Sequence, residues 1–212
     1  MDAPTPPPDL SFETAARGRG ALRIAGVDEV GRGPLAGPVT AAAVILHPAR
    51  IPEGLQDSKL LTAPVRERLA VQIIAASEVA VAHASVHEIE TLNILRASHL
   101  AMCRAIAQLS PDYAIVDGNA LPADLGCPGE AVVRGDGRCL SVAAASIVAK
   151  VARDRIMVDL AQQHPGYGWE TNSGYSTKRH ILALNEFGAT AHHRRTFAPV
   201  YNILCREKSI SP

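Results

Sequence analysis

The sequence predicts an α/β fold in which a mixed sheet carries helices on its faces. Short apolar runs alternate with longer segments whose apolar residues recur at helical spacing. The elements follow the order strand, strand, helix, strand, helix, strand, strand, helix, which is typical of a mixed sheet. With 47% hydrophobic and 20% charged residues among 212, the chain also has enough apolar material for a core.

The first elements are an arm, a hairpin and a helix. Four of the first eight residues are proline, so we expect a flexible arm over residues 1–20. Leu22–Glu29 is the first expected strand, and Val39–His47 pairs with it as a hairpin across a glycine-rich loop. A helix begins after Thr62, the expected N-cap, with Pro64 in its first turn.

The next segments complete the sheet. Glu78–Val86 has a strand pattern, and Leu92–Leu109 is one long amphipathic helix that ends before Pro111. Two short strands follow, over Asp112–Asp117 and Glu130–Val133. Each of these strands leads directly into a glycine-containing turn, as expected for a strand that ends at the rim of a sheet.

The C-terminal third is helical and basic. A helix is expected from Ser141 to Gln163, and another around Thr177–Phe187 before an Arg-rich tail. Residues 1–149 carry 12 Lys and Arg against 16 Asp and Glu, whereas residues 150–212 carry 9 against 5. Such asymmetry suits a polyanion held on one side of the molecule. We therefore divide the chain into an arm (1–20), a main domain (21–165) and a basic helical extension (166–212).

The cysteines and the hydropathy pattern indicate the cellular compartment in which the protein is expected. The four cysteines are scattered and form no C-x-x-C pair, which argues against a zinc site or disulfide framework and favours a reducing compartment. The N-terminus has no basic segment followed by an apolar run, and no later segment reaches membrane-spanning length. We expect a cytoplasmic protein with no membrane partner.

Carboxylates follow three of the expected strands. Asp28 and Glu29 end the first strand, Asp117 ends the fourth, and Asp136 follows the fifth. Acids from separate strands can converge at the rim of a sheet, and clustered carboxylates suit hard cations such as Mg²⁺ or Mn²⁺. Asp117 alone would be explained as a turn residue. The adjacent pair that ends an apolar run gains nothing from packing, so we favour a metal site.

The glycine-rich loop after Glu29 brings backbone close to a ligand. It is not a phosphate-binding P-loop, because no Gly-Lys-Ser/Thr ends it. It is not a dinucleotide fingerprint either, because its third glycine falls one residue late, Pro34 intrudes and a strand follows. By itself the loop could be a tight hairpin turn.

Further residues could contact nucleic acid. Ser146 and Lys150 share one helix face, where they could meet phosphates or solvent. Tyr175 stands beside basic residues, a usual arrangement for stacking on a base or sugar, although it could also be half-buried at a helix start. The run from His192 to Arg195 is interpreted as a solvated basic face.

Taken together, these segments resemble bacterial ribonuclease HII. The resemblance covers residues 22–200 and rests on motifs in that family's order, of which the first is long and specific: GVDEVGRGPLAGPV, DSKLL, VDGN, VRGD, AASIVAKVARD, SGYSTKRH and HRRTFAPV. The resemblance implies a ribonuclease H-like fold and a requirement for Mg²⁺ or Mn²⁺. It also implies cleavage of the RNA strand of RNA/DNA hybrids and nicking beside single ribonucleotides in duplex DNA.

The resemblance assigns residues to roles. It places the four catalytic and metal-binding acids at Asp28, Glu29, Asp117 and Asp136. Asp154 is the alternative for the fourth position, but Asp136 is preferred because it follows a strand in a VRGD element.

The resemblance also implies contacts to substrate. A loop that senses the 2′-hydroxyl maps onto Gly31, Arg32 and Gly33, and a tyrosine at the RNA–DNA junction maps onto Tyr175. Lys59, Ser146 and Lys150 complete the expected substrate contacts. The chain departs from the family pattern at Ala143, Ser173 and Ser176, which bears on contacts to the substrate backbone rather than on the acids. The sister ribonuclease HIII carries a long N-terminal extension and lacks this form of the loop, so HII fits better.

The expected mechanism is hydrolysis with one or two divalent ions per site, which activate water and stabilise the leaving 3′-oxygen. Products would be a 3′-hydroxyl and a 5′-phosphate, from a monomeric enzyme. Two rival interpretations are a nicotinamide-dependent oxidoreductase, which lacks its fingerprint, and a non-catalytic RNA-binding module, which leaves the acids unexplained. Metal-dependent nicking of a hybrid duplex separates the three.

Overall fold

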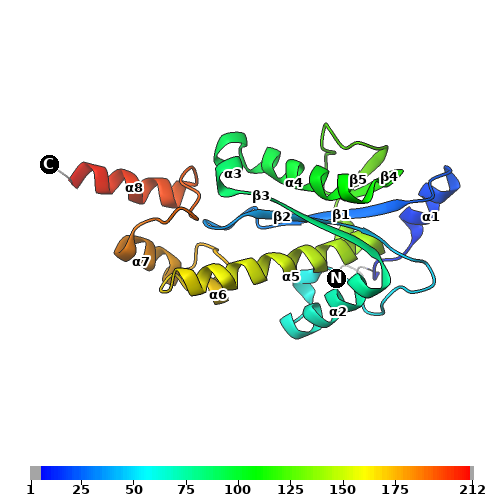
Figure 1. Ribbon diagram of the computed structural model, residues 1–212, viewed down its shortest axis with the longest axis horizontal. Helices are drawn as coiled ribbons and strands as arrows, with labels where there is room; N and C mark the ends of the chain where they lie inside the picture. Colours follow the sequence, from blue (N-terminus) through cyan, green and yellow to red (C-terminus); the bar gives the residue numbers. More distant parts are fainter. Residues whose placement is uncertain (1–5, 211–212) are drawn as a thin grey trace, which may run out of the picture.

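The computed structural model describes residues 6–210, with side chains described up to residue 205, and within this range the molecule is built on a five-stranded sheet (Figure 1). The order is β3-β2-β1-β4-β5. The strands are β1 (Ile24–Val30), β2 (Val39–Ile45), β3 (Glu78–Ala84), β4 (Tyr113–Asp117) and β5 (Gly129–Val132). The first three pair antiparallel, and β1, β4 and β5 pair parallel, which confirms the expected mixed sheet.

Helices cover both faces of the sheet. α3 (Val86–Leu92) and α4 (Ile94–Leu109) lie on one face, and α2 (Ala63–Ala76) and α5 (Leu140–Gln163) lie on the other (Figure 1). Each face has its own apolar core, because alternate strand residues point to opposite sides. Within residues 6–210, no helix combines the length and apolarity needed to cross a bilayer.

The long helix α5 approaches β1 very closely at Gly26. A Cβ atom at this position would lie 2.1 Å from the carbonyl carbon of Ser141, so only glycine fits. The close contact brings the face of α5 that carries Ser146 against β1, which contains Asp28 and Glu29 near its C-terminal end. The C-terminal residues of β1 are therefore held between the sheet and α5.

A second group of helices packs at the far end of α5. It contains α6 (Trp169–Asn172), α7 (Lys178–Phe187) and α8 (Ala198–Ile210), and confirms the expected C-terminal helical extension (Figure 1). Its core joins Met157 of α5 to Leu35 of the β1–β2 loop and to Trp169. The loop after β1 is thus packed against the C-terminal extension.

The expectation of a flexible arm over residues 1–20 is wrong for its second half. α1 (Ser11–Gly18) is a helix whose Ala16 is fully buried against Ile24 and Val142. Its Glu13 accepts hydrogen bonds from the Ser141 amide (2.9 Å) and the Cys139 thiol (3.0 Å) at the start of α5. Residues 1–5, which include Pro4, lie outside the described residues.

Two other expectations about helices need correction. The helix expected over Leu92–Leu109 begins at Ile94, after Asn93, whose φ is 70° and whose side chain caps it, and Leu92 instead ends the separate helix α3. Thr62 stands at the N-cap of α2 as expected, but its side chain makes no capping hydrogen bond. Its carbonyl instead accepts the amide of Arg66.

Candidate active site

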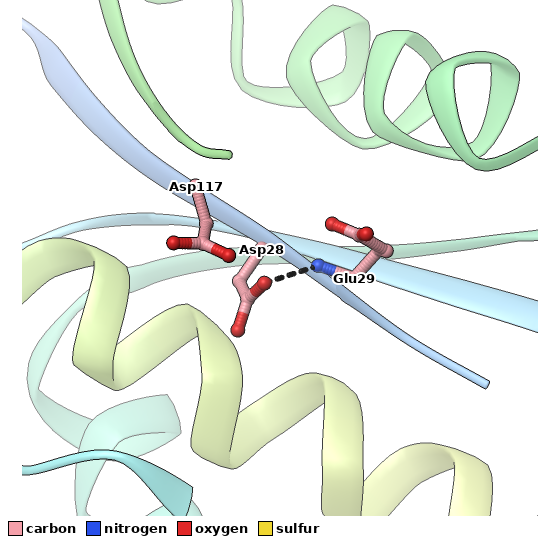
Figure 2. A group of neighbouring side chains, drawn as sticks. All are labelled: Asp28, Glu29 and Asp117. Carbon is pink, nitrogen blue, oxygen red and sulfur yellow. Dashed lines mark hydrogen bonds between the residues drawn. The ribbon is translucent and has the colours of Figure 1, made fainter. Parts of the chain in front are cut away.

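Three carboxylates meet where β1 and β4 end. Asp28, Glu29 and Asp117 each offer an oxygen within 4.8 Å of the others. Strands β1 and β4 pair in parallel up to Val27 and Val116. The next residue is Asp28 on β1 and Asp117 on β4, so the two carboxylates lie on neighbouring strands. Figure 2 shows Asp28 pointing toward α5, while Glu29 leaves β1 on the other side. An Asp28 oxygen accepts the Glu29 amide at 2.7 Å.

Burial and mutual repulsion disfavour the charged forms of these acids. Burial raises the pKa of Asp28 well above its ordinary range, and the charges of Glu29 and Asp117 raise it further. Burial also raises the pKa of Glu29, although the Arg32 guanidinium opposes the shift. The pKa of Asp117 is raised chiefly by burial, although the Gly135 amide, which donates at 2.7 Å, lowers it.

The donor set fits a divalent cation. Oε2 of Glu29 is buried and has no hydrogen-bond partner among the described residues. A buried, unpartnered carboxylate oxygen is costly unless a cation coordinates it. Several carboxylate oxygens close together are the ligand set of hard ions such as Mg²⁺ and Mn²⁺. The three acids therefore have the chemistry of a metal centre.

The fourth expected acid, Asp136, lies beside this group rather than within it. It belongs to the 3₁₀ turn η2 (Gly135–Gly137) and is 6% exposed. The residue before it donates its amide to Asp117, and Lys59 Nζ lies 3.3 Å from its Oδ2. Asp117, Asp136 and Lys59 line one groove of about 890 Å³.

The alternative fourth acid, Asp154, lies elsewhere on α5. Its carboxylate pairs with Lys150 at 2.7 Å and accepts the Ser173 hydroxyl at 3.1 Å. It lines a different groove, between α2 and α5. Two turns of helix separate it from Ser146, roughly 12 Å of axial rise. Asp136 is thus the acid that the fold brings next to Asp117.

The glycine loop and the tyrosine are brought together. A Cβ at Gly33 would lie 3.5 Å from Cε1 of Tyr175, in ordinary van der Waals contact. The Tyr175 ring is 44% exposed, and its carbonyl accepts a hydrogen bond from Nδ1 of the buried His180 at 2.9 Å. An exposed aromatic ring therefore lies against an exposed glycine, although more than a hundred residues separate them.

Comparison with known proteins decides the family. Residues 25–200 match the family described as ribonuclease HII. A ribonuclease HII of Cereibacter sphaeroides is 66% identical over 207 residues, covering 97% of this chain and 98% of the relative. The chain belongs to the ribonuclease HII family. It is accordingly a metal-dependent ribonuclease H, an endoribonuclease.

Solved structures agree with the fold of a ribonuclease HII. The ribonuclease H2 of Pyrococcus horikoshii OT3 superposes with a TM-score of 0.74 at 28% identity, over 88% of this chain and 99% of that one. A Bst-RNase HIII, solved in complex with Mn²⁺, shares the fold with a TM-score of 0.74 at 21% identity, over 92% of this chain and 73% of that one. The ribonuclease H-like architecture expected from the sequence is therefore confirmed.

The remaining expected substrate contacts of this ribonuclease HII lie at different distances from the acids. Ser146 bonds Asp28 and shares a 2.9 Å hydrogen bond with the buried Ser58. Lys59 stands at the rim with its side chain 78% exposed. Lys150 is turned toward Asp154 and away from the acid group. Of the departures from the family pattern, Ala143 is buried beneath the sheet, Ser173 bonds Asp154, and Ser176 is exposed.

Two residues of the ribonuclease HII site escaped the sequence analysis. Arg153 and Arg194 are both fully buried, and each donates to main-chain carbonyls around the glycine loop. The interpretation of residues 192–195 as a solvated basic face is therefore wrong for His193 and Arg194, which are 1% and 0% exposed. Arginine is usually an exposed residue, both in a helix such as α5, which contains Arg153, and in the loop that contains Arg194, so only the structure could identify them.

Proposed function

We propose that this ribonuclease HII hydrolyses the RNA strand of RNA/DNA hybrids and nicks duplex DNA on the 5′ side of single embedded ribonucleotides. The observation that carries the proposal is the meeting of Asp28, Glu29 and Asp117 beside a loop and a ring suited to a sugar. Cutting there leaves a 3′-hydroxyl and a 5′-phosphate.

The chain's own acids would bind the metal. Asp28, Glu29 and Asp117 form the core of the site, and Asp136 joins from the neighbouring turn. The chemistry that two bound divalent ions supply at such a site is activation of a water and stabilisation of the leaving 3′-oxygen. Asp28 and Glu29 project from opposite sides of β1, so the site offers ligands on both sides of the strand end (Figure 2).

Recognition of the substrate would come from the loop and the rim. The backbone of Gly31, Arg32 and Gly33 contacts the ribose 2′-hydroxyl, which only RNA presents. Tyr175 packs on the next deoxyribose, where no 2′-oxygen would crowd the ring. Lys59, Ser146 and Lys150 contact the substrate backbone, with Lys59 held at the rim by its ion pair with Asp136.

We propose that one chain forms a complete, cytoplasmic catalytic unit that uses Mg²⁺ or Mn²⁺. All four acids come from one chain, so the site needs no second copy. No disulfide joins the cysteines among the described residues, as in a reducing compartment. The acids offer only oxygen ligands, and Mg²⁺ and Mn²⁺ are ions that prefer oxygen. Mn²⁺ is also the ion in the solved Bst-RNase HIII complex.

A cleavage assay on a duplex with one ribonucleotide tests the proposal. Product must form with Mg²⁺ or Mn²⁺ and not with chelator, and its ends must be a 3′-hydroxyl and a 5′-phosphate. Absence of metal-dependent cleavage, or a 2′,3′-cyclic phosphate end, would contradict it. An all-DNA duplex of the same sequence must remain uncut.

Asp28→Asn is the matched variant, and its effects on activity and stability should have opposite signs. Loss of a charged ligand should abolish cleavage. A carboxyl whose folded pKa is raised destabilises the fold at every pH above its unfolded pKa, so at pH 7 its neutralisation should raise Tm in metal-free buffer. A fall in Tm together with lost cleavage would assign Asp28 to folding instead.

A further inference from the structure

Arg194 is a buried cation whose hydrogen bonds all go to backbone carbonyls among the described residues, while its guanidinium lies 5.1 Å from the centre of the Phe197 ring. Its guanidinium donates to the carbonyls of Gly31 (2.6 Å), Arg32 (3.0 Å), Gly37 (3.0 Å) and Pro38 (3.2 Å). Burial lowers the pKa of this guanidinium to about 9, so it stays charged at neutral pH. Four neutral carbonyls thus hold a charge that has no carboxylate partner within residues 6–210.

Two of these hydrogen bonds fix successive peptide groups. In a trans peptide, the carbonyl of one residue and the amide of the next point in opposite directions, and the described chain has no cis peptide. The Gly31 carbonyl points at Arg194, so the Arg32 amide points away from it. The Arg32 carbonyl also points at Arg194, so the Gly33 amide points away as well.

The side of the loop away from Arg194 is the exposed side. Arg194 is fully buried, whereas Arg32 and Gly33 are exposed. Neither amide donates to an acceptor among residues 6–210. Beside them lie the ring of Tyr175 at Gly33 and the carboxylate of Glu29, which pairs with the Arg32 side chain. Two amide donors without an acceptor among residues 6–210 therefore lie in the loop that contacts both Glu29 and Tyr175.

We infer that Arg194 is a positioning residue for ribose recognition: it aims the amides of Arg32 and Gly33 at the 2′-oxygen of the substrate. The inference rests on the proposed function, because it explains how that function distinguishes RNA from DNA. A 2′-hydroxyl accepts from these amides, whereas deoxyribose has no atom in their reach. Arg194 touches no substrate itself and acts through two peptide planes.

A lysine in place of Arg194 cannot bind the same set of backbone carbonyls. The arginine fork presents several N–H groups in fixed, planar directions, whereas an ammonium is a point charge with three rotatable donors. Lysine would keep the charge and much of the volume but could not hold four carbonyls at once. Arg194→Lys is therefore the informative change.

The test compares the binding of two duplexes that differ by one 2′-oxygen. Fluorescence anisotropy gives Kd for each in an Asp28→Asn background, which binds without cutting. The ratio of the DNA Kd to the ribonucleotide Kd should fall at least about 5-fold in Arg194→Lys, because the hydrogen bonds from the two amides to the 2′-oxygen are lost. An unchanged ratio in the folded variant overturns the inference. A ratio of one in the Asp28→Asn protein with Arg194 intact also overturns it, because that protein would then not distinguish the two duplexes.

Two control variants separate positioning from stability. Arg153 is equally buried and packs against the same loop, but it donates to the carbonyls of Ala36, Pro38 and Ser173 and not to those of Gly31 and Arg32. Arg153→Lys should lower Tm as Arg194→Lys does and yet keep the ratio. Arg195→Lys, at the exposed neighbour, should change neither. Equal loss of the ratio in both buried variants would mean that general loosening of the loop is responsible, and would overturn the inference.

A second pair of variants leaves Arg194 in place and decides the matter if Arg194→Lys does not fold. Gly33→Pro removes one of the two amides, whereas Gly33→Ala keeps it and meets only ordinary contact with Tyr175. The ratio must fall further in Gly33→Pro than in Gly33→Ala, and equal ratios overturn the inference. Failure of the proposed function is distinct, because then the unmodified chain does not cut.

Discussion

At the scale of single residues, the site is a group of acids that oppose one another's charge. Asp28 is 5% exposed and next to two other carboxylates, so its ionised form is unfavourable without a cation. The sequence could predict these acids because each one ends an apolar strand, and strand ends meet at a rim. It could not predict the role of Arg194, because the sequence His-His-Arg-Arg is equally compatible with a solvated basic patch and with a buried guanidinium.

The histidines illustrate the same limit. Nδ1 of His180 must donate to the Tyr175 carbonyl, and its Nε2 accepts from the Trp169 indole. His193 then donates through Nε2 to His180 and accepts the Thr190 amide at Nδ1, so both rings are neutral. Burial lowers the pKa of His193 to about 3, in keeping with this assignment. Four hydrogen bonds decide these roles, and none of them is visible in the sequence.

The structure favours Asp136 over Asp154 as the fourth acid. Asp136 borders Asp117 through Gly135, whereas Asp154 pairs with Lys150 in another groove. We expect Asp136→Asn to reduce kcat by at least about 100-fold, the scale of losing a charged group that stabilises the transition state. Asp154→Asn should change kcat little. Steady-state cleavage of the single-ribonucleotide duplex measures both, and the reverse ranking would move the fourth ligand to Asp154.

At the scale of elements, periodicity located α4 but did not reveal the short helix α3 before it. The apolar residues of α3 and α4 pack in the same core, and Asn93 separates the two helices. Asparagine tolerates a positive φ, which allows the chain to turn there. The arm over residues 1–20 failed for a related reason: its prolines dominate the composition, while Ala16 and Glu13 of α1 make the contacts that order it.

The contact between β1 and α5 positions Ser146 beside Asp28, and Gly26 makes it possible. Gly26→Ala would drive a Cβ into the backbone of Ser141, and overpacking of this kind typically costs about 1–3 kcal/mol, occasionally more. We expect a lower denaturant midpoint and a lower kcat, because α5 must move away from the acids. Gly18→Ala is the control, since its Cβ would meet no atom within 4 Å. A normal kcat in Gly26→Ala would show that the spacing of α5 does not matter for the site.

At the scale of the whole molecule, the site is assembled from both ends of the chain. The β1–β2 loop supplies Gly33, and the C-terminal extension supplies Tyr175 and Arg194. The extension's core includes Leu35 of that same loop, so recognition and packing are coupled. Charge asymmetry along the sequence suggested a basic face, but the proximity of Tyr175 to Gly33 depends on tertiary packing that no local pattern encodes.

This assembly gives Tyr175 a testable role at the junction between RNA and DNA. Its ring is exposed beside Gly33, where the sugar after the recognised ribose would lie. Stacking on a nucleotide contributes about 1–3 kcal/mol, so Tyr175→Ala should slow cleavage at a single ribonucleotide roughly 10-fold. Tyr175→Phe keeps the ring and should lose less than Tyr175→Ala.

The substrate comparison decides what the ring recognises. A continuous RNA strand on DNA never presents a deoxyribose after the scissile ribose, so the favourable packing of the ring is absent there before any mutation. Tyr175→Ala should therefore slow hybrid cleavage less than junction cleavage, measured as kcat/KM on both duplexes with the same preparation. Equal losses would mean that Tyr175 merely holds the duplex in place. Discrimination at the junction would then fall to the amides of Arg32 and Gly33, which the hydrogen bonds of Arg194 direct outward.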